Sequence, residues 1–137
     1  MKNLTIFDIA GRAMSAQQSR LNAVASNLAN AQSISSSPDT AYRAMRPVFE
    51  TEYAAFMQNS GVATVASVGI ERSQAVPEKR YSPTHPLADK DGYIYATNVD
   101  SNEEMVEMME ASRQYQNNIE VIATAKSLML TTRGVGK

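Results

Sequence analysis

The sequence predicts an α+β fold, in which long N- and C-terminal helices pair as an antiparallel coiled coil beside a small β-rich middle segment. Two observations support this prediction. Apolar residues recur at intervals of seven near both ends of the chain, and β-branched and turn-forming residues gather between them. We therefore expect residues 1–32 and 101–137 to form one helical domain, with 33–100 as a linker and a small β-rich segment.

The first predicted helix covers residues 5 to about 31, and Thr5 with Asp8 fits a capping pair at its start. Its apolar row consists of Phe7, Met14, Leu21 and Leu28, with Val24 three residues after Leu21. A row that keeps a period of seven is typical of a helix that supercoils around a partner helix.

Within this helix, RLNAVASNLANAQS (residues 20–33) combines alanines with amide residues that rank poorly in helix interiors. The alanines would let neighbouring helices approach closely. Asn27 and Asn30 lie beside the apolar row, where a polar group that needs a partner can fix the register of two helices at some cost in stability. We expect both asparagines to belong to an assembly interface.

The middle of the chain is predicted to contain turns and short strands. The stretch SISSSPDT (33–40) is a polar linker, and residues 43–53 and 62–70 have extended character. Pro47 would confine the first of these strands to a sheet edge. Tyr81 and residues 93–95 flank a turn-rich segment that contains Asp91-Gly92, which favours a hairpin turn over a calcium loop.

The second predicted helix covers residues 101 to about 132, with Ser101 and Glu104 as a capping box. Its apolar row is Met108, Tyr115, Ile122 and Met129, supported by Met105 and Ile119. The acidic group Glu103, Glu104, Glu107 and Glu110 is expected to form a solvated face or to contact basic residues of a partner, not to act in catalysis. Its last turns are apolar on more than one side, so the helix needs several neighbours, more than a chain of 137 residues supplies.

Composition excludes several classes of protein. A net charge of −1 excludes a basic nucleic-acid footprint, and the absence of cysteine excludes disulfides and thiolate metal sites. The sequence contains no run of 18 apolar residues, so we expect no membrane-spanning helix. The first 15 residues lack the apolar core of a signal peptide, so we expect no cleaved signal peptide there. His85 is the single histidine, in a proline-flanked loop, so we expect no catalytic residue, cofactor or metal.

The sequence resembles the axial proteins of the bacterial flagellum. SAQQSRLNAVASNLANA (15–31) is similar to their shared motif, and YSPTHPLADKDGYIYATNVDSNEEMVEMMEASRQYQNN (81–118) resembles the proximal rod proteins, although Thr97 stands where that group usually has proline. The resemblance implies a non-enzymatic subunit of the tubular rod, which transmits torque and surrounds the export channel. It also implies a location in the periplasmic space, self-assembly with other rod proteins, and passage through the flagellar type III export apparatus without signal-peptide cleavage or membrane insertion.

On this hypothesis we assign two sets of residues. The assembly interface would comprise Phe7, Met14, Leu21, Val24, Asn27, Leu28, Asn30, Met105, Met108, Tyr115, Ile119, Ile122 and Met129. A polar stripe would face the export channel, or simply solvent: Arg113, Asn117, Glu120, Thr124, Ser127 and Thr131. Two alternatives remain open at this point: another flagellar axial subunit, or a cytosolic coiled-coil adaptor or export chaperone.

Overall fold

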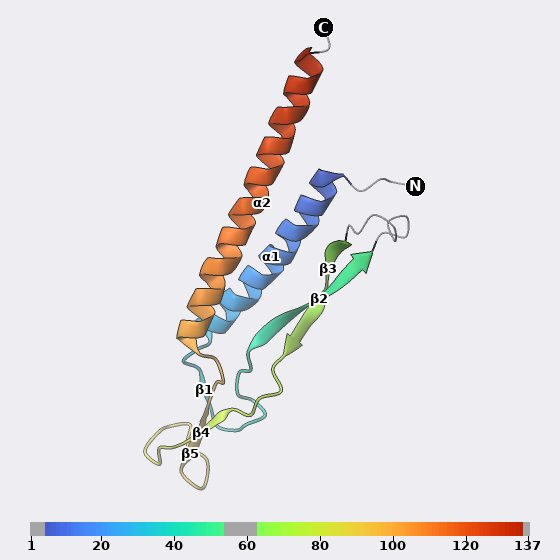
Figure 1. The fold of residues 1–137 in the computed structure, drawn as a ribbon. Coiled ribbons are helices and arrows are strands. Elements are labelled where there is room, and N and C mark those ends of the chain that lie inside the picture. The colour runs from blue at the N-terminus through green and yellow to red at the C-terminus, as the bar shows by residue number, and fades with distance from the viewer. Residues whose placement is uncertain (1–4, 54–62, 136–137) are drawn as a thin grey trace.

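A computed structural model describes residues 5–53 and 63–135, and it confirms the α+β class. The elements, in chain order, are α1 (Ile6–Ala29), β1 (Ile34–Ser35), β2 (Met45–Tyr53), β3 (Ala63–Arg72), β4 (Glu78–Tyr81), β5 (Tyr93–Ala96) and α2 (Ser101–Val135). The molecule is elongated, with the helices toward one end and a small sheet at the other (Figure 1).

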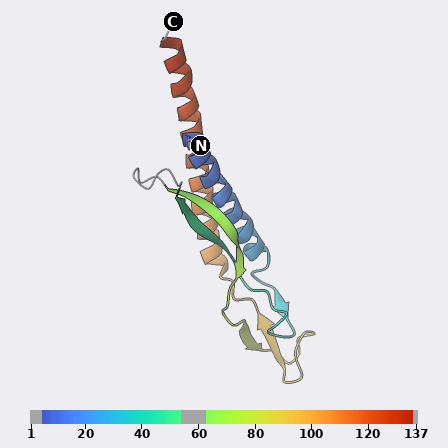
Figure 2. The ribbon, with the colours of Figure 1, turned by 90° about the vertical axis from the view of Figure 1, so that its right-hand side faces the viewer.

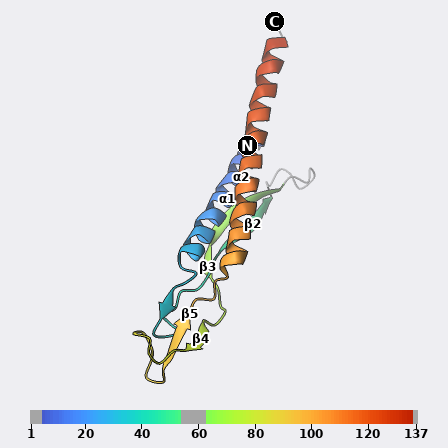
Figure 3. The ribbon, with the colours of Figure 1, turned by 90° about the vertical axis from the view of Figure 1, so that its left-hand side faces the viewer.

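The two helices run antiparallel, and α1 lies between α2 and the β2–β3 hairpin. The hairpin covers one face of the helix pair (Figure 2), and the opposite side, seen in Figure 3, carries α2. The helices differ in length, with 24 residues in α1 and 35 in α2. The last turns of α2 therefore extend past the start of α1, and no described element of the chain lies beside them (Figure 1).

The start of α1 confirms the predicted capping pair. The Thr5 hydroxyl accepts a hydrogen bond from the backbone N–H of Asp8 at 3.2 Å, and the Asp8 carboxylate accepts one from the backbone N–H of Thr5 at 2.9 Å. The helix ends at Ala29, slightly before the predicted end near residue 31, because Asn30 caps it. The Asn30 side-chain amide donates to the Ser26 carbonyl at 2.8 Å, which satisfies one of the exposed carbonyls of the last turn.

The start of α2 corrects a prediction. Asp100, not Ser101, caps the helix: its carboxylate accepts from the backbone N–H of Asn102 at 2.8 Å. Glu104 does not fold back toward the cap, because its carboxylate is buried between α1 and β2 (see below). The helix also continues beyond the predicted end near residue 132, to Val135.

The strand predictions are confirmed, in two separate antiparallel sheets, but the short strand β1 lies within the stretch 33–40, which the sequence predicts as a linker. β2 pairs with β3 from Met45 opposite Arg72 to Tyr53 opposite Ala63, with a register shift between Val48 and Phe49. Both strands are edges of a two-stranded sheet, so the missing N–H of proline in β2 is tolerated. The second sheet has the order β1-β5-β4, so β5 is its central strand.

The core of the molecule is built largely from alanine. The buried apolar positions are Ala10, Ala16, Ala23 and Val24 on α1, Ala111 and Ala125 on α2, Ala41 and Ala44 in the segment before β2, and Ile94 and Ala96 on β5. Small side chains let the two helix backbones approach closely, but they remove little apolar area from water. Stability against the entropy of ordering therefore depends strongly on the polar contacts described next.

Candidate assembly interface

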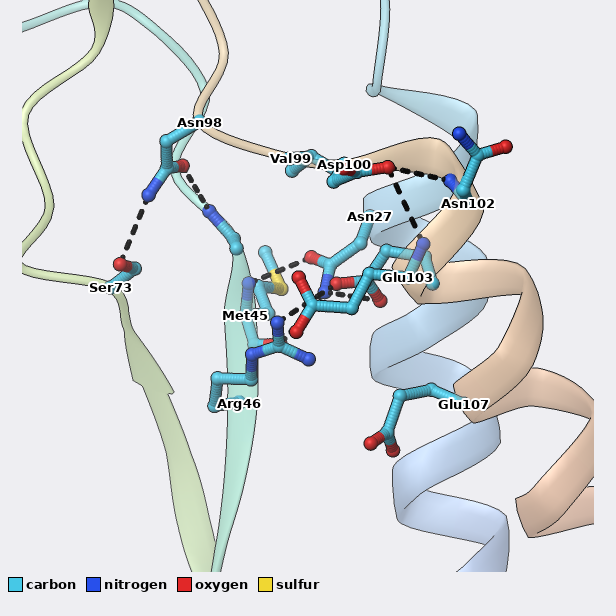
Figure 4. Close-up of polar contacts among 12 residues, drawn as sticks. Asn27, Met45, Arg46, Ser73, Asn98, Val99, Asp100, Asn102, Glu103 and Glu107 are labelled. Carbon is cyan, nitrogen blue, oxygen red and sulfur yellow. Dashed lines mark hydrogen bonds and ion pairs between the residues drawn. The ribbon is translucent and has the colours of Figure 1, made fainter.

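Asn27 is the centre of a buried polar cluster that joins both helices to the hairpin (Figure 4). Its side chain is 0% exposed. The amide nitrogen donates to the Met45 carbonyl at 2.9 Å and to the Glu104 carboxylate at 3.0 Å. The amide oxygen accepts from the Met45 backbone N–H at 2.7 Å and from the Tyr42 hydroxyl at 3.0 Å. One amide on α1 thus fixes the first residue of β2 and the first turn of α2.

Glu104 completes this cluster from α2. Only 1% of the residue is exposed, which corrects the expectation that it belongs to a solvated acidic face. One carboxylate oxygen accepts from Asn27, and the other lies 3.2 Å from a guanidinium nitrogen of Arg46 on β2. A buried carboxylate is tolerated when it is both paired and hydrogen-bonded. Three elements far apart in sequence therefore meet at one charge.

A second polar junction holds the base of the hairpin. The side chain of Asn98, in the segment that leads into α2, accepts from the Ala44 backbone N–H at 3.0 Å and donates to the Ser73 hydroxyl at 3.0 Å (Figure 4). The Ser73 backbone N–H in turn donates to the Ala44 carbonyl at 2.8 Å. The hairpin is therefore attached to the helix pair at its entry and at its exit.

The predicted interface residues have different environments in the single chain. Val24 and Asn27 are buried. The half-buried members are Phe7, Met14, Leu21, Leu28, Asn30, Met108, Tyr115 and Ile122, and the exposed members are Met105, Ile119 and Met129. The half-buried rows border the contact between the helices and still present part of each side chain outward, so they are available to neighbouring molecules as well.

Apolar periodicity alone missed a second row on α2. Glu104, Ala111, Asn118 and Ala125 also repeat every seven residues, each four residues before a member of the predicted apolar row. Glu104, Ala111 and Ala125 are the buried residues of this helix. Because the row consists of a charge, an amide and alanines, it gives no hydrophobic signal. The spacing alone could have identified it.

The polar stripe on α2 is exposed at every one of its positions, from Arg113 to Thr131. Thr131 donates its hydroxyl hydrogen bond to the Ser127 carbonyl within the helix, at 3.0 Å. Asn117, Glu120 and Thr124 line a shallow groove beside Ile6 of α1, and all six residues of the stripe keep exposed surface.

Large apolar side chains on α2 are exposed as well. The exposed fractions of Val106, Met109, Leu128 and Leu130 are 64%, 68%, 63% and 61%. None of the described helices, α1 and α2, has both the length and the apolar character needed to cross a membrane. Such a concentration of apolar side chains on one exposed helix is typical of a surface that another protein covers.

The loop between β4 and β5 is held by its own hydrogen bonds. The Asp89 carboxylate accepts from the backbone N–H groups of Tyr93 at 2.8 Å and Asp91 at 2.9 Å. These bonds, first of all the one from Tyr93, keep the pKa of the Asp89 carboxyl below its ordinary value. His85 accepts from the Leu87 backbone N–H at 3.1 Å, which is a structural turn contact.

Comparison with known proteins agrees with this picture of an interaction protein. The family of flagella basal body rod proteins matches residues 7–32, and the C-terminal family of the flagellar basal body rod FlgEFG proteins matches residues 90–134. Flagellar basal-body rod proteins FlgC from Salmonella typhimurium, Escherichia coli O6:H1 and Yersinia enterocolitica are 52%, 50% and 43% identical to the chain. Each of these alignments covers 100% of both proteins.

Proposed function

The chain belongs to the FlgC family of flagellar basal-body rod proteins, and we propose that its paired terminal helices form part of the wall of the rod. It is a structural subunit of the basal body, in a family that is not enzymatic. The proposal rests mainly on the surface of α2. Large apolar side chains such as Met109, Leu128 and Leu130 are exposed on this helix, and so is the polar stripe from Arg113 to Thr131.

The helix pair is proposed to pack as an antiparallel coiled coil and to act as one domain, made of residues 1–32 and 101–137. Two interleaved rows of period seven on α2 support this proposal, because they match the two inward positions of a heptad repeat. On α1 the counterpart is the row from Phe7 to Leu28, with Val24 buried beside it.

Torque is proposed to pass through many stiff contacts between subunits. Within the subunit, the Asn27–Glu104–Arg46 cluster supports this role, because a buried carboxylate that is both hydrogen-bonded and ion-paired favours a single arrangement of the elements that it joins. The β2–β3 hairpin would then move with the helices as one body. The outer surface of the hairpin and residues 33–53, which include β1 and β2, are proposed to contact neighbouring subunits.

The polar stripe of α2 is proposed to line the export channel. Its six residues contain one arginine and one glutamate, so its net charge is zero. A neutral polar wall offers unfolded chains in transit neither an apolar surface nor a strong field. The exposure of all six stripe residues in the single chain supports this position.

The proposed partners are further copies of the chain, other rod proteins and the flagellar type III export apparatus. The proposed location is the rod in the periplasmic space, reached from the cytoplasm without signal-peptide cleavage. The small alanine core supports an export route that requires unfolding, because helices that bury little apolar area are less stable in the single chain than against neighbours.

Complementation of a strain that lacks this chain tests the proposal. The unaltered chain should restore motility, whereas Leu28→Asp or Ile122→Asp should abolish rod assembly without abolishing synthesis, because each places an unpaired charge in the half-buried helix seam. Lys90→Asp, in an exposed loop, introduces the same carboxylate as a matched control and should preserve motility. Normal motility in either seam variant would contradict the proposal.

A further inference from the structure

A polar pocket lies where the helix pair meets the small sheet. Its volume is about 760 Å³, and its walls come from the end of α1, the segment 33–43 and the exit from β3 (Figure 1). This volume falls within the range typical of ligand sites, about 300–1,000 Å³. Ile34 and Ala41 are the apolar members of the described lining, and the other side chains there are polar or charged. The pocket therefore suits a polar occupant.

Two arginines bring positive charge to this pocket. Arg43 is half-buried in the segment before β2, and Arg72 is exposed at the end of β3. Within residues 5–53 and 63–135, neither guanidinium forms an ion pair. Asp39 is the one acidic side chain in the described lining, so the three charged groups sum to +1. A guanidinium presents its N–H donors in a planar fork that fits a carboxylate, so the pocket favours an acidic occupant.

The walls of the pocket are held by their own hydrogen bonds. The hydroxyl group of Thr40 contacts those of Ser35 and Ser37, the latter at 2.9 Å, which closes the loop of the linker on itself. The Tyr42 hydroxyl donates to the buried amide of Asn27 at 3.0 Å, so the tyrosine ring in the lining is fixed from behind. An occupant would meet walls that are already ordered, which lowers the entropy cost of binding.

One buried polar group in the lining lacks a partner. The hydroxyl oxygen of Ser33 is buried and forms no hydrogen bond with any described residue. The backbone of Ser33 is satisfied, because its N–H donates to the Asn30 carbonyl at 3.0 Å and its carbonyl accepts from Thr97 at 3.3 Å. Buried side-chain hydroxyl groups normally have a partner. An acceptor oxygen brought into the pocket would supply the missing hydrogen bond.

We propose that this pocket takes an aspartate or glutamate side chain from a different protein of the basal body, with the carboxylate between Arg43 and Arg72. The proposal rests on the proposed function, in which residues 33–53 contact neighbouring subunits, and it names the chemistry of one such contact. A different protein is favoured over a second copy, because exposed acidic groups of α2 lie on the side proposed to line the channel: Glu103, Glu110 and Glu120.

Photo-cross-linking in basal bodies tests the contact directly. Gln74 is exposed and lines the pocket, so a benzoylphenylalanine would replace it. We expect a product heavier than the chain by the mass of a different basal-body protein, attached within a few residues of an aspartate or glutamate of that protein. A product with the mass of two chains, an attachment site far from any acidic residue, or no product at all would overturn the inference.

Charge reversal separates an ionic contact from mere proximity. Arg72→Glu should lower the yield of the cross-link per basal body by roughly tenfold or more, the effect of losing one hydrogen bond between charged groups. Arg72→Lys keeps the charge and should retain most of the yield. Lys90→Glu, in an exposed loop, makes the same change of charge as a matched control and should leave the yield unaltered. Equal yields in the two Arg72 variants, or an equal loss in Lys90→Glu, would overturn the inference.

Two further measurements separate the contact from an effect on folding. The midpoint of urea unfolding of the purified chain should be the same with and without Arg72→Glu, because Arg72 forms no ion pair within the described residues. A lowered midpoint would assign Arg72 to the fold and overturn the inference. Replacement of the cross-linked protein's acidic residue by lysine should restore the yield in Arg72→Glu, and a failure to restore it would overturn the proposed pairing. Absence of the unaltered chain from basal bodies would instead contradict the proposed function.

Discussion

Substitution of Asn27 by alanine should destabilise the folded chain more than any other change of one amide on α1. The variant removes four hydrogen bonds, to Met45 N–H, Met45 carbonyl, Glu104 and Tyr42. Tyr42 keeps a contact with the Ser26 hydroxyl at 3.1 Å. The two backbone groups of Met45 and the Glu104 carboxylate lose a partner each, at about 1–3 kcal/mol per group, which gives a loss of roughly 3–9 kcal/mol.

Urea unfolding of the purified chain, followed by circular dichroism, measures this loss. The expected loss is comparable with the whole free energy of unfolding of a small domain, about 5–15 kcal/mol, so the Asn27→Ala variant should be largely unfolded at low urea. Asn22→Ala is the matched control on the same helix, because Asn22 is exposed and accepts one bond from Gln18 at 3.2 Å. A loss below about 1 kcal/mol for Asn27→Ala would refute the reasoning that this cluster holds the elements together.

Three further predictions concern single groups. Glu104→Ala should lower the free energy of unfolding by about 2–4 kcal/mol, and Glu104→Gln by less than half of that, because glutamine keeps an acceptor for Asn27. Chemical denaturation of both variants measures the two losses, and equal losses would contradict this prediction. Gly92→Ala should lower the free energy of unfolding by about 1–3 kcal/mol, since Gly92 has a φ of 81° and an added Cβ would lie 3.1 Å from the Pro83 side chain. Gly11→Ala, in open space on α1, should stabilise the chain slightly. Thermal unfolding compares the two variants, and stabilisation by both would contradict the argument. Because the pKa of Asp89 is lowered in the folded chain, its carboxylate stabilises the loop at pH values above the ordinary pKa. This contribution is lost as the pH falls below about 4 and through the lowered pKa. An NMR titration of Asp89 that finds an ordinary or raised pKa would disprove this prediction.

Much of the fold could be predicted from local patterns. The period-seven rows located both helices, Thr5 and Asp8 marked the start of the first, and β-branched residues located the long hairpin. These features depend on residues close together in sequence. Helix ends were less accurate, because the caps Asn30 and Asp100 compete with neighbouring polar residues that have similar propensity.

The polar cluster could be predicted only in part. Asn27 was recognised as an amide that needs a partner, but its partners Met45 and Glu104 are 18 and 77 residues away in sequence, and only the folded chain brings them together. The burial of Glu104 has no local signal, since its position three residues after Ser101 fits a capping box and carboxylates are rarely buried without a partner. The assembly contacts stay predictions, since the residues that would cover α2 belong to other molecules.

A cryo-electron microscopy map of intact basal bodies tests most directly the claim that this chain forms part of the rod wall through its terminal helices. We predict that α2 lies in the wall, with Asn117, Thr124 and Thr131 toward the central channel and the exposed apolar flanks against neighbouring subunits. A map in which this polar stripe packs against other subunits would contradict the channel assignment. A map in which the helix pair lies outside the wall would contradict the central claim.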